Sequence, residues 1–140
     1  MPGATKEEFY QTLDGAPYAA RAFFEAVEAQ FANRNSVFVH FTNTNGGDLR
    51  LATPNVIARN GKPRNFATMY WQPKKSIVHS RMFLSPEELR RLGFDHATMP
   101  KRSTEPLRAE LRLTEDFWRE KSADFGRFLE AAHVKMLAQA

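Results

Sequence analysis

The fold is decided by the stretch Asn65-Phe66-Ala67-Thr68-Met69-Tyr70-Trp71-Gln72-Pro73-Lys74-Lys75. Residues 65–72 would be apolar on both faces of a strand, which is typical of a strand in the middle of a sheet. Pro73-Lys74-Lys75 then predicts a tight basic turn into a second strand over residues 76–84. Because consecutive strands joined by a short turn pair antiparallel, the sequence predicts a central antiparallel hairpin.

Alternating hydrophobicity predicts two strands before this hairpin. Apolar and polar side chains alternate over residues 37–41 and again over residues 48–52. Residues 43–48 are rich in Asn and Gly, so they predict a hairpin turn between the two strands. Pro54 cannot donate to a strand ladder. We therefore expect Pro54 to interrupt the second strand and residues 55–59 to form a further short strand.

Helices are predicted before and after the central strands in the sequence. Thr5-Lys6-Glu7-Glu8 and Ser85-Pro86-Glu87-Glu88 both match a capping box, in which the first side chain and the final Glu satisfy each other's backbone amides. Residues 18–32 carry an apolar stripe at steps of three and four. Residues 107–113 alternate as a half-buried strand does, and Thr114 is expected to cap one long final helix.

The predicted order is two helices, four or five strands, a short helix, a strand and a long helix. Short turns join most of the strands, so the sheet of about five strands should be mainly antiparallel, with the helices on one face. This is a two-layer α+β fold. A chain of 140 residues without repeats or linkers fits a single domain over residues 1–140.

Composition excludes several classes of protein. A hydrophobic content of 42% is too high for a disordered chain, and the absence of cysteine excludes a disulfide framework and thiolate chemistry. No stretch approaches the ~18 apolar residues of a membrane span, and the first residues lack the apolar part of a secretory signal. The sequence therefore predicts a soluble cytoplasmic protein that has no membrane partner.

Motifs for catalysis, metals and cofactors do not occur in the sequence. There is no phosphate loop, and no histidine pair has a metal-ligand spacing among His40, His79, His96 and His133. Asp48 and Glu110 begin no acid-x-Lys pattern of a metal-dependent nuclease. We therefore expect neither a metal nor a cofactor, and an enzyme is the least supported class. Its first candidate site would be a pocket that joins His40, Asp48, His79 and Arg81.

The middle of the chain is strongly basic. Residues 50–102 contain eleven Lys and Arg and three acidic residues, a net charge of +8, whereas the whole chain carries +4. A concentrated positive charge attracts nucleic acid and other polyanions. A solvated surface, in which basic and acidic parts meet in the folded protein, explains the same pattern equally well.

The alternation also assigns side chains to the sheet face opposite the helices. The candidate anion-binding residues there, together with the basic turn, are Arg50, Tyr70, Lys74, Lys75, His79, Arg81, Arg108 and Arg112. His40 and Glu110 are expected on the same face. Whether the Tyr70 or the Trp71 ring lies there depends on the strand register. Arg suits phosphate because its planar fork donates two parallel hydrogen bonds, and aromatic rings beside it offer stacking surfaces for unpaired bases.

The leading hypothesis is therefore a non-catalytic binding module that contacts nucleic acid or another polyanion. Two alternatives use the same face. A polar face is normal on an open antiparallel sheet, so these residues could be merely solvated. Phe38 and Ile77 would also point outward, and two apolar residues there suit a homodimer formed face to face.

The stretch Arg64–Ile77, with Asn65-Phe66-Ala67 and Pro73-Lys74-Lys75, resembles a signature of a small bacterial α+β domain of unknown function. Members occur alone, or fused to predicted nuclease-like domains and to predicted transport proteins. The resemblance implies the same order of elements over roughly Ala20 to Met136, and its association with nucleases implies nucleic acid as a partner. Trp71 is an extra residue relative to the signature, which predicts a bulge there.

Overall fold

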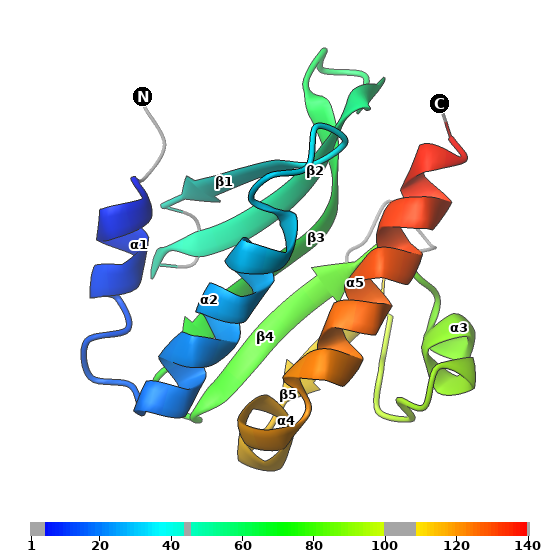
Figure 1. Ribbon diagram of the computed structural model, residues 1–140. Helices are drawn as coiled ribbons and strands as arrows, with labels where there is room; N and C mark the ends of the chain where they lie inside the picture. Colours follow the sequence, from blue (N-terminus) through cyan, green and yellow to red (C-terminus); the bar gives the residue numbers. More distant parts are fainter. Residues whose placement is uncertain (1–4, 44–45, 100–108, 140) are drawn as a thin grey trace.

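The computed structural model describes residues 5–43, 46–99 and 109–139 (Figure 1). The chain begins with helices α1 (Lys6–Gln11) and α2 (Tyr18–Phe31). The remaining elements, in order, are β1 (Phe38–Thr42), β2 (Asp48–Ile57), β3 (Pro63–Gln72), β4 (Ile77–Met82), α3 (Pro86–Arg91), β5 (Ala109–Leu113), α4 (Glu115–Glu120) and α5 (Ser122–Leu137).

The strands form one sheet in the order β1-β2-β3-β4-β5, and every neighbouring pair is antiparallel. β3 lies in the centre, as its sequence predicts. Helices α2 and α5 cross one face of the sheet (Figure 1), where α2 contacts β1 and α5 contacts β2 and β3. The predicted two-layer α+β fold is confirmed.

The hydrophobic core fills the space between the helices and the sheet. The apolar stripe of α2 is buried there, as predicted, through Ala20, Phe23, Phe24, Val27 and Phe31. The strands contribute every second residue, chiefly Leu49, Leu51, Ala67, Met69, Val78, Met82, Leu111 and Leu113. This alternation defines the inner face of the sheet and leaves the intervening residues on the opposite side, called the outer face below.

Both predicted capping boxes are present. The Glu8 amide donates to Thr5 Oγ1 at 3.1 Å, and the Glu88 amide donates to Ser85 Oγ at 3.1 Å. In each box the glutamate carboxylate accepts a hydrogen bond from the backbone amide of the cap residue. The starts of α1 and α3 are therefore determined by local sequence.

Pro54 does not end β2. The strand continues to Ile57, so the separate strand predicted over residues 55–59 is wrong. Its pairing with β3 is irregular between Thr53 and Ile57, because proline has no N–H to donate to the ladder. The Thr53 hydroxyl donates to the Arg64 carbonyl at 3.2 Å and ties the two strands at this point.

The bulge in β3 lies at Phe66 and not at Trp71, which pairs regularly with Val78. Leu51 is opposite Ala67 and the next residue, Ala52, is opposite Asn65. Phe66 is therefore an extra residue between them, which changes the alternation at this point. The Phe66 ring is fully buried in the core.

The single long final helix predicted after Thr114 is wrong. Lys121, with φ −122° and ψ 32°, separates α4 from α5. The Trp118 indole anchors α4, because Nε1 donates to the Ser76 carbonyl at 3.1 Å and the ring lies edge-on to Trp71 at 5.6 Å. The chain bends so that α5 can cover β2 and β3. Thr114 does occupy the N-cap of α4, but its side chain makes no capping hydrogen bond.

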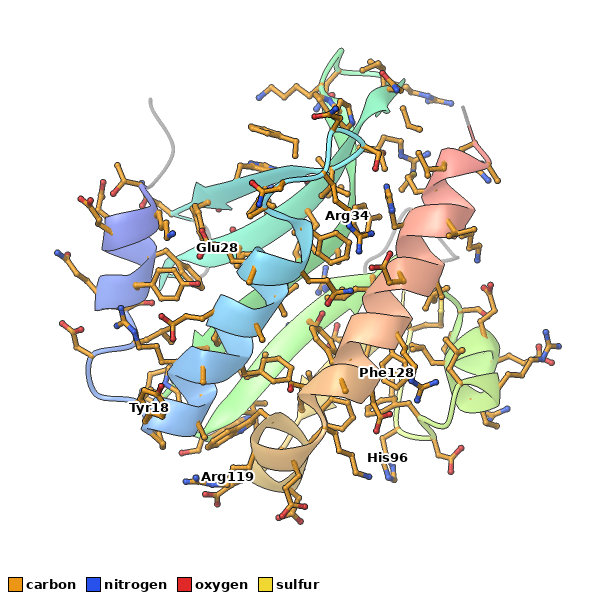
Figure 2. All side chains as sticks on the ribbon, in the orientation of Figure 1. Tyr18, Glu28, Arg34, His96, Arg119 and Phe128 are labelled. Carbon is orange, nitrogen blue, oxygen red and sulfur yellow. The ribbon has the colours of Figure 1, made fainter. Side chains whose placement is uncertain are left out.

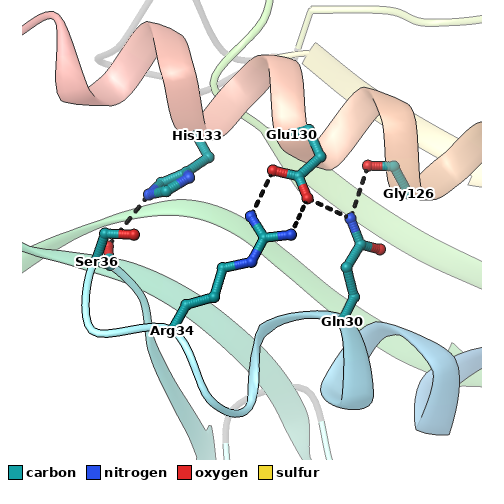
Figure 3. Close-up of polar contacts among 6 residues, drawn as sticks. All are labelled: Gln30, Arg34, Ser36, Gly126, Glu130 and His133. Atoms are coloured by element: carbon teal, nitrogen blue, oxygen red, sulfur yellow. Dashed lines mark hydrogen bonds and ion pairs between the residues drawn. The ribbon is translucent and has the colours of Figure 1, made fainter.

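A polar network joins the end of α2 to α5 (Figure 3). Arg34 binds the Glu130 carboxylate through both Nη atoms, with Nη1 at 2.7 Å from Oε1. Gln30 Nε2 donates to Glu130 at 2.9 Å and to the Gly126 carbonyl at 3.1 Å. A Cβ atom at Gly126 would lie 2.7 Å from Gln30 Oε1, so glycine leaves room for the Gln30 amide in its present position.

His133 belongs to the core rather than to a reactive site. Its ring is 5.0 Å from Phe66 and 6.3 Å from Phe31. Its Nε2 lies 3.2 Å from the Ser36 carbonyl (Figure 3). The buried imidazole is therefore both packed and hydrogen-bonded.

Candidate functional site

The strand register gathers the predicted side chains on the outer face. One row of Cα partners crosses all five strands through His40, Arg50, Thr68, Arg81 and Glu110. The neighbouring row contains Tyr70, His79 and Arg112. These residues alternate with core residues along each strand, so they point away from the helices. Tyr70 is on this face and Trp71 is in the core, whereas Arg108 lies outside the described residues.

Glu110 is the centre of a charged cluster on β4 and β5, called the Glu110 cluster below. Its Oε1 lies 3.1 Å from His79 Nε2 and 3.4 Å from Arg112 Nη2. Its Oε2 lies 3.3 Å from Arg81 Nη2. The Glu110 side chain is 11% exposed, whereas those of Arg81 and Arg112 are 48% and 66% exposed. One carboxylate therefore serves two arginines that remain open to water.

Arg50 is the second basic residue of the row, and Asp48 balances its charge. The Arg50 Nε lies 3.2 Å from Asp48 Oδ1, and Nη2 lies 3.3 Å from Oδ2. The Thr42 hydroxyl also donates to Asp48, which is almost fully buried. Arg50, Arg81 and Arg112 share the outer face, but each has a carboxylate neighbour, so the face is less positive than these three arginines imply.

Two pairs of rings lie on the same face. Phe38 stacks on His40 with ring centroids 4.9 Å apart and planes 7° apart. Tyr70 lies over His79 at 4.8 Å. Phe38 is 50% exposed, so its outer ring face is open. Ile77, which was expected to join Phe38 in a dimer contact, is only 8% exposed and is therefore not available for one.

Lys74 and Lys75 lie in the turn between β3 and β4 and are exposed. The turn closes through Ser76, which has a positive φ of 51°. Along the strand direction, successive rows of outer-face residues are ~6.6 Å apart, because they are two residues apart in each strand. The distance from the row of Phe38 to the row of Gln72 and Ile77 is therefore about 20 Å. The two lysines therefore lie at the opposite end of the outer face from Phe38.

Burial and the neighbouring groups together determine the protonation of the Glu110 cluster. Burial lowers the pKa of His79 below 6.5 and outweighs the opposing effect of the hydrogen bond to Glu110. At neutral pH the imidazole is therefore uncharged, and its Nε2–H donates to the carboxylate. Burial alone would raise the pKa of Glu110, but the hydrogen bond with His79 and the charges of Arg81 and Arg112 outweigh it and lower that pKa.

The stability of the protein should consequently decrease as the pH falls below about 7. Unfolded His79 titrates near 6.5 and folded His79 titrates lower, so the unfolded state binds more protons in this range and is favoured as pH falls. One histidine contributes at most about 1.4 kcal/mol per pH unit. Urea unfolding at several pH values should show a smaller slope for His79→Gln than for the wild type. A slope for His79→Gln equal to that of the wild type would contradict the assignment.

The four residues expected to share an enzyme pocket fall into three separate groups of contacts. His40 Nε2 lies 3.0 Å from Asn65 Oδ1, Asp48 contacts Arg50 and Thr42, and both His79 and Arg81 contact Glu110. Over residues 5–43, 46–99 and 109–139, no three His, Asp or Glu side chains are grouped as metal ligands. No helix in these ranges has the length and apolarity to cross a membrane.

Sequence reasoning missed how the outer face is neutralised. Strand alternation placed Glu110, which stands between Arg108 and Arg112 at two-residue spacing, on the same face as these arginines, but it did not predict the contacts that Glu110 makes there. Asp48 stands two residues before Arg50 in the same strand, a spacing that likewise assigns both residues to one face, but whether the two side chains meet depends on their conformation. Comparison of the chain with protein-family models, with curated proteins and with solved structures finds no match. The resemblance of Arg64–Ile77 to a bacterial domain signature therefore stays an expectation.

Proposed function

We propose that the protein is a non-catalytic intracellular module that binds single-stranded nucleic acid on the outer face of its sheet. The observation that carries the proposal is the combination, on one face, of two exposed guanidinium groups with an exposed aromatic stack. Arg81 and Arg112 supply the charge, and Phe38 with His40 supplies the stacking surface. Sheet faces that bind single strands combine these two features.

The arginines retain donors for phosphate although Glu110 contacts both. A guanidinium has five N–H donors, and a single Nη2 atom of Arg81 and of Arg112 faces Glu110, at 3.3 Å and 3.4 Å. These distances exceed the 2.7–2.9 Å of strong charge-assisted hydrogen bonds. The arginine side of each pair is also open to water, which screens the interaction. Replacing this contact with a phosphate contact therefore costs little.

The exposed ring favours a single strand over a duplex. Bases can stack on Phe38 only when they are unpaired and unstacked, because a duplex hides their faces. Stacking on an aromatic side chain contributes about 1–3 kcal/mol per base and tolerates any sequence. Lys74 and Lys75 at the far end of the face would contact further phosphates.

Fluorescence anisotropy with labelled oligonucleotides of RNA and DNA, single-stranded and duplex, tests the proposal at about 50 mM and about 200 mM salt. We expect single strands to bind at micromolar protein, more tightly than duplexes, and to weaken at the higher salt. Arg81→Gln removes one charge-assisted contact and should weaken binding roughly tenfold. Arg91→Gln, at an arginine on α3 that is more exposed than Arg81, is the control and should have little effect. Absence of salt-sensitive binding would contradict the proposal.

The homodimer alternative uses the same face and is distinguished in the same samples. Phe38 is exposed but Ile77 is buried, so one of the two residues expected at a dimer contact remains. Sedimentation equilibrium with and without oligonucleotide gives the oligomeric state. A stable dimer that binds no oligonucleotide would favour the homodimer, whereas a monomer that binds single strands supports the proposed function.

A further inference from the structure

A cleft lies at the β5 edge of the sheet, where the segment after α3 meets α4 and the start of α5. Its volume is about 410 Å³, and its lining includes Phe94, His96, Arg112, Phe117 and Lys121. A second hollow of about 220 Å³ adjoins it and shares Phe94, His96, Phe117 and Lys121. Figure 2 shows His96 and Phe128, which line this second hollow, at the same end of the molecule. The larger volume lies within the range of small-molecule sites, about 300–1,000 Å³.

One wall of the cleft is aromatic. Phe94 is 7% exposed and therefore fixed, and three rings meet it edge-on: Phe117 at 5.6 Å, His96 at 5.9 Å and Phe128 at 5.9 Å. The Phe117 side chain is half-buried and His96 is exposed. These two rings therefore offer surface to a planar ligand while Phe94 holds them in place.

The charged groups of the cleft favour an anion. Arg112 and Lys121 line it together with one carboxylate, that of Asp116. In the part of the chain that the structure describes, no carboxylate lies within ion-pair distance of Lys121. The smaller hollow is lined by two carboxylates, those of Asp95 and Asp124, of which Asp124 is already paired with Arg127 at 2.7 Å. Lys121 is therefore a cation available to a ligand.

Arg112 joins the cleft to the outer face. The same residue belongs to the Glu110 cluster and lines the cleft. A single-stranded nucleic acid that lies along the row of Tyr70, His79 and Arg112 would reach the β5 edge at this point. From this continuity we propose that the cleft holds one nucleotide of the bound single strand. Its base would pack on Phe117 and His96, and its phosphate would lie between Arg112 and Lys121. This inference rests on the proposed function.

The probes are mononucleotides, the matching nucleoside and inorganic phosphate, titrated against the full chain by NMR or calorimetry. We expect saturable mononucleotide binding that exceeds the binding of nucleoside or phosphate alone, because base and phosphate would be held together. Lys121→Glu should weaken mononucleotide binding roughly tenfold or more, and His96→Ala should weaken it severalfold. Lys62→Glu, in the exposed turn before β3, is the matched control. Lys121 is exposed and precedes α5, so an acidic residue there is compatible with folding, which an unchanged unfolding midpoint would verify.

The outcomes separate this inference from the proposed function. If oligonucleotides bind through Arg81 but mononucleotides do not, and Lys121→Glu changes neither, the inference is overturned and the proposed function stands. If mononucleotides bind through Lys121 but oligonucleotides do not bind, the proposed function fails and with it the link between cleft and strand. If phosphate binds as tightly as the mononucleotide, the role given to the aromatic wall is overturned.

Discussion

Phe66→Ala is expected to lower the free energy of unfolding by about 3–5 kcal/mol. Domains of this kind have total stabilities of about 5–15 kcal/mol, so the loss would be a large share of the whole. The ring is fully buried and packs against Phe31 at 5.8 Å and His133 at 5.0 Å. Truncation would leave a cavity between the central strand and both long helices, because Phe31 belongs to α2 and His133 to α5.

Phe38→Ala is the matched control for this prediction. It removes the same side chain from the outer face, where Phe38 is 50% exposed, and should cost less than about 1 kcal/mol. Urea unfolding followed by circular dichroism measures both variants. If Phe66→Ala costs no more than Phe38→Ala, the bulge does not place Phe66 in the core, and the packing of β3 described above is wrong.

Most of the fold could be predicted because the relevant interactions are local or periodic. The caps at Thr5 and Ser85 lie within four residues of their partners. The sequence over residues 107–113 alternates so regularly that inner side chains could be assigned from it, and Leu111 and Leu113, in β5, are indeed in the core. The same alternation placed Arg81 and Arg112 on one face before any contact was known.

The differences arise where packing over long sequence distances decides the backbone. A bulge at Phe66 turns an additional large ring toward α2 and α5, and a strand pattern alone does not reveal which residue is extra. The break at Lys121 likewise depends on Trp118, which bonds to Ser76, 42 residues earlier in the chain. The cleft between β5 and α4 exists because of that break, so the sequence contained no signal for it.

The charge of the candidate site depended on side-chain geometry in the same way. Strand alternation assigns a face, but not which oxygen meets which guanidinium. In the structure Glu110 and Asp48 each lie beside outer-face arginines. Such neutralisation is also what a merely solvated outer face would show. The two explanations differ in what they expect when the charges of the Glu110 cluster are changed.

The double variant Arg81→Gln/Arg112→Gln should reduce affinity for single strands by roughly 100-fold or more. Each guanidinium would contribute a charge-assisted hydrogen bond of about 1.5 kcal/mol or more, and two such losses correspond to this factor. The dependence on salt should become weaker as well, because fewer cations replace the counterions of the nucleic acid. Anisotropy titrations at two salt concentrations measure both effects.

Arg91→Gln/Arg119→Gln is the control for net charge. Both arginines are exposed on helices, where they pair with Glu87 and Glu115, and their loss changes the charge of the protein by the same amount. Equal losses of affinity in the two double variants would mean that the total charge of the protein attracts the oligonucleotide and that the outer face has no special role.

Glu110→Gln should have the opposite effect and raise the affinity for single strands severalfold. The substitution removes the one carboxylate that contacts both Arg81 and Arg112 but keeps a hydrogen-bond acceptor for the neutral His79. The arginines would then face a ligand phosphate without a competing anion. A solvated face predicts no change in either direction. If affinity falls when Arg81 and Arg112 are replaced and rises when Glu110 is replaced, the single-stranded nucleic acid must bind at the Glu110 cluster.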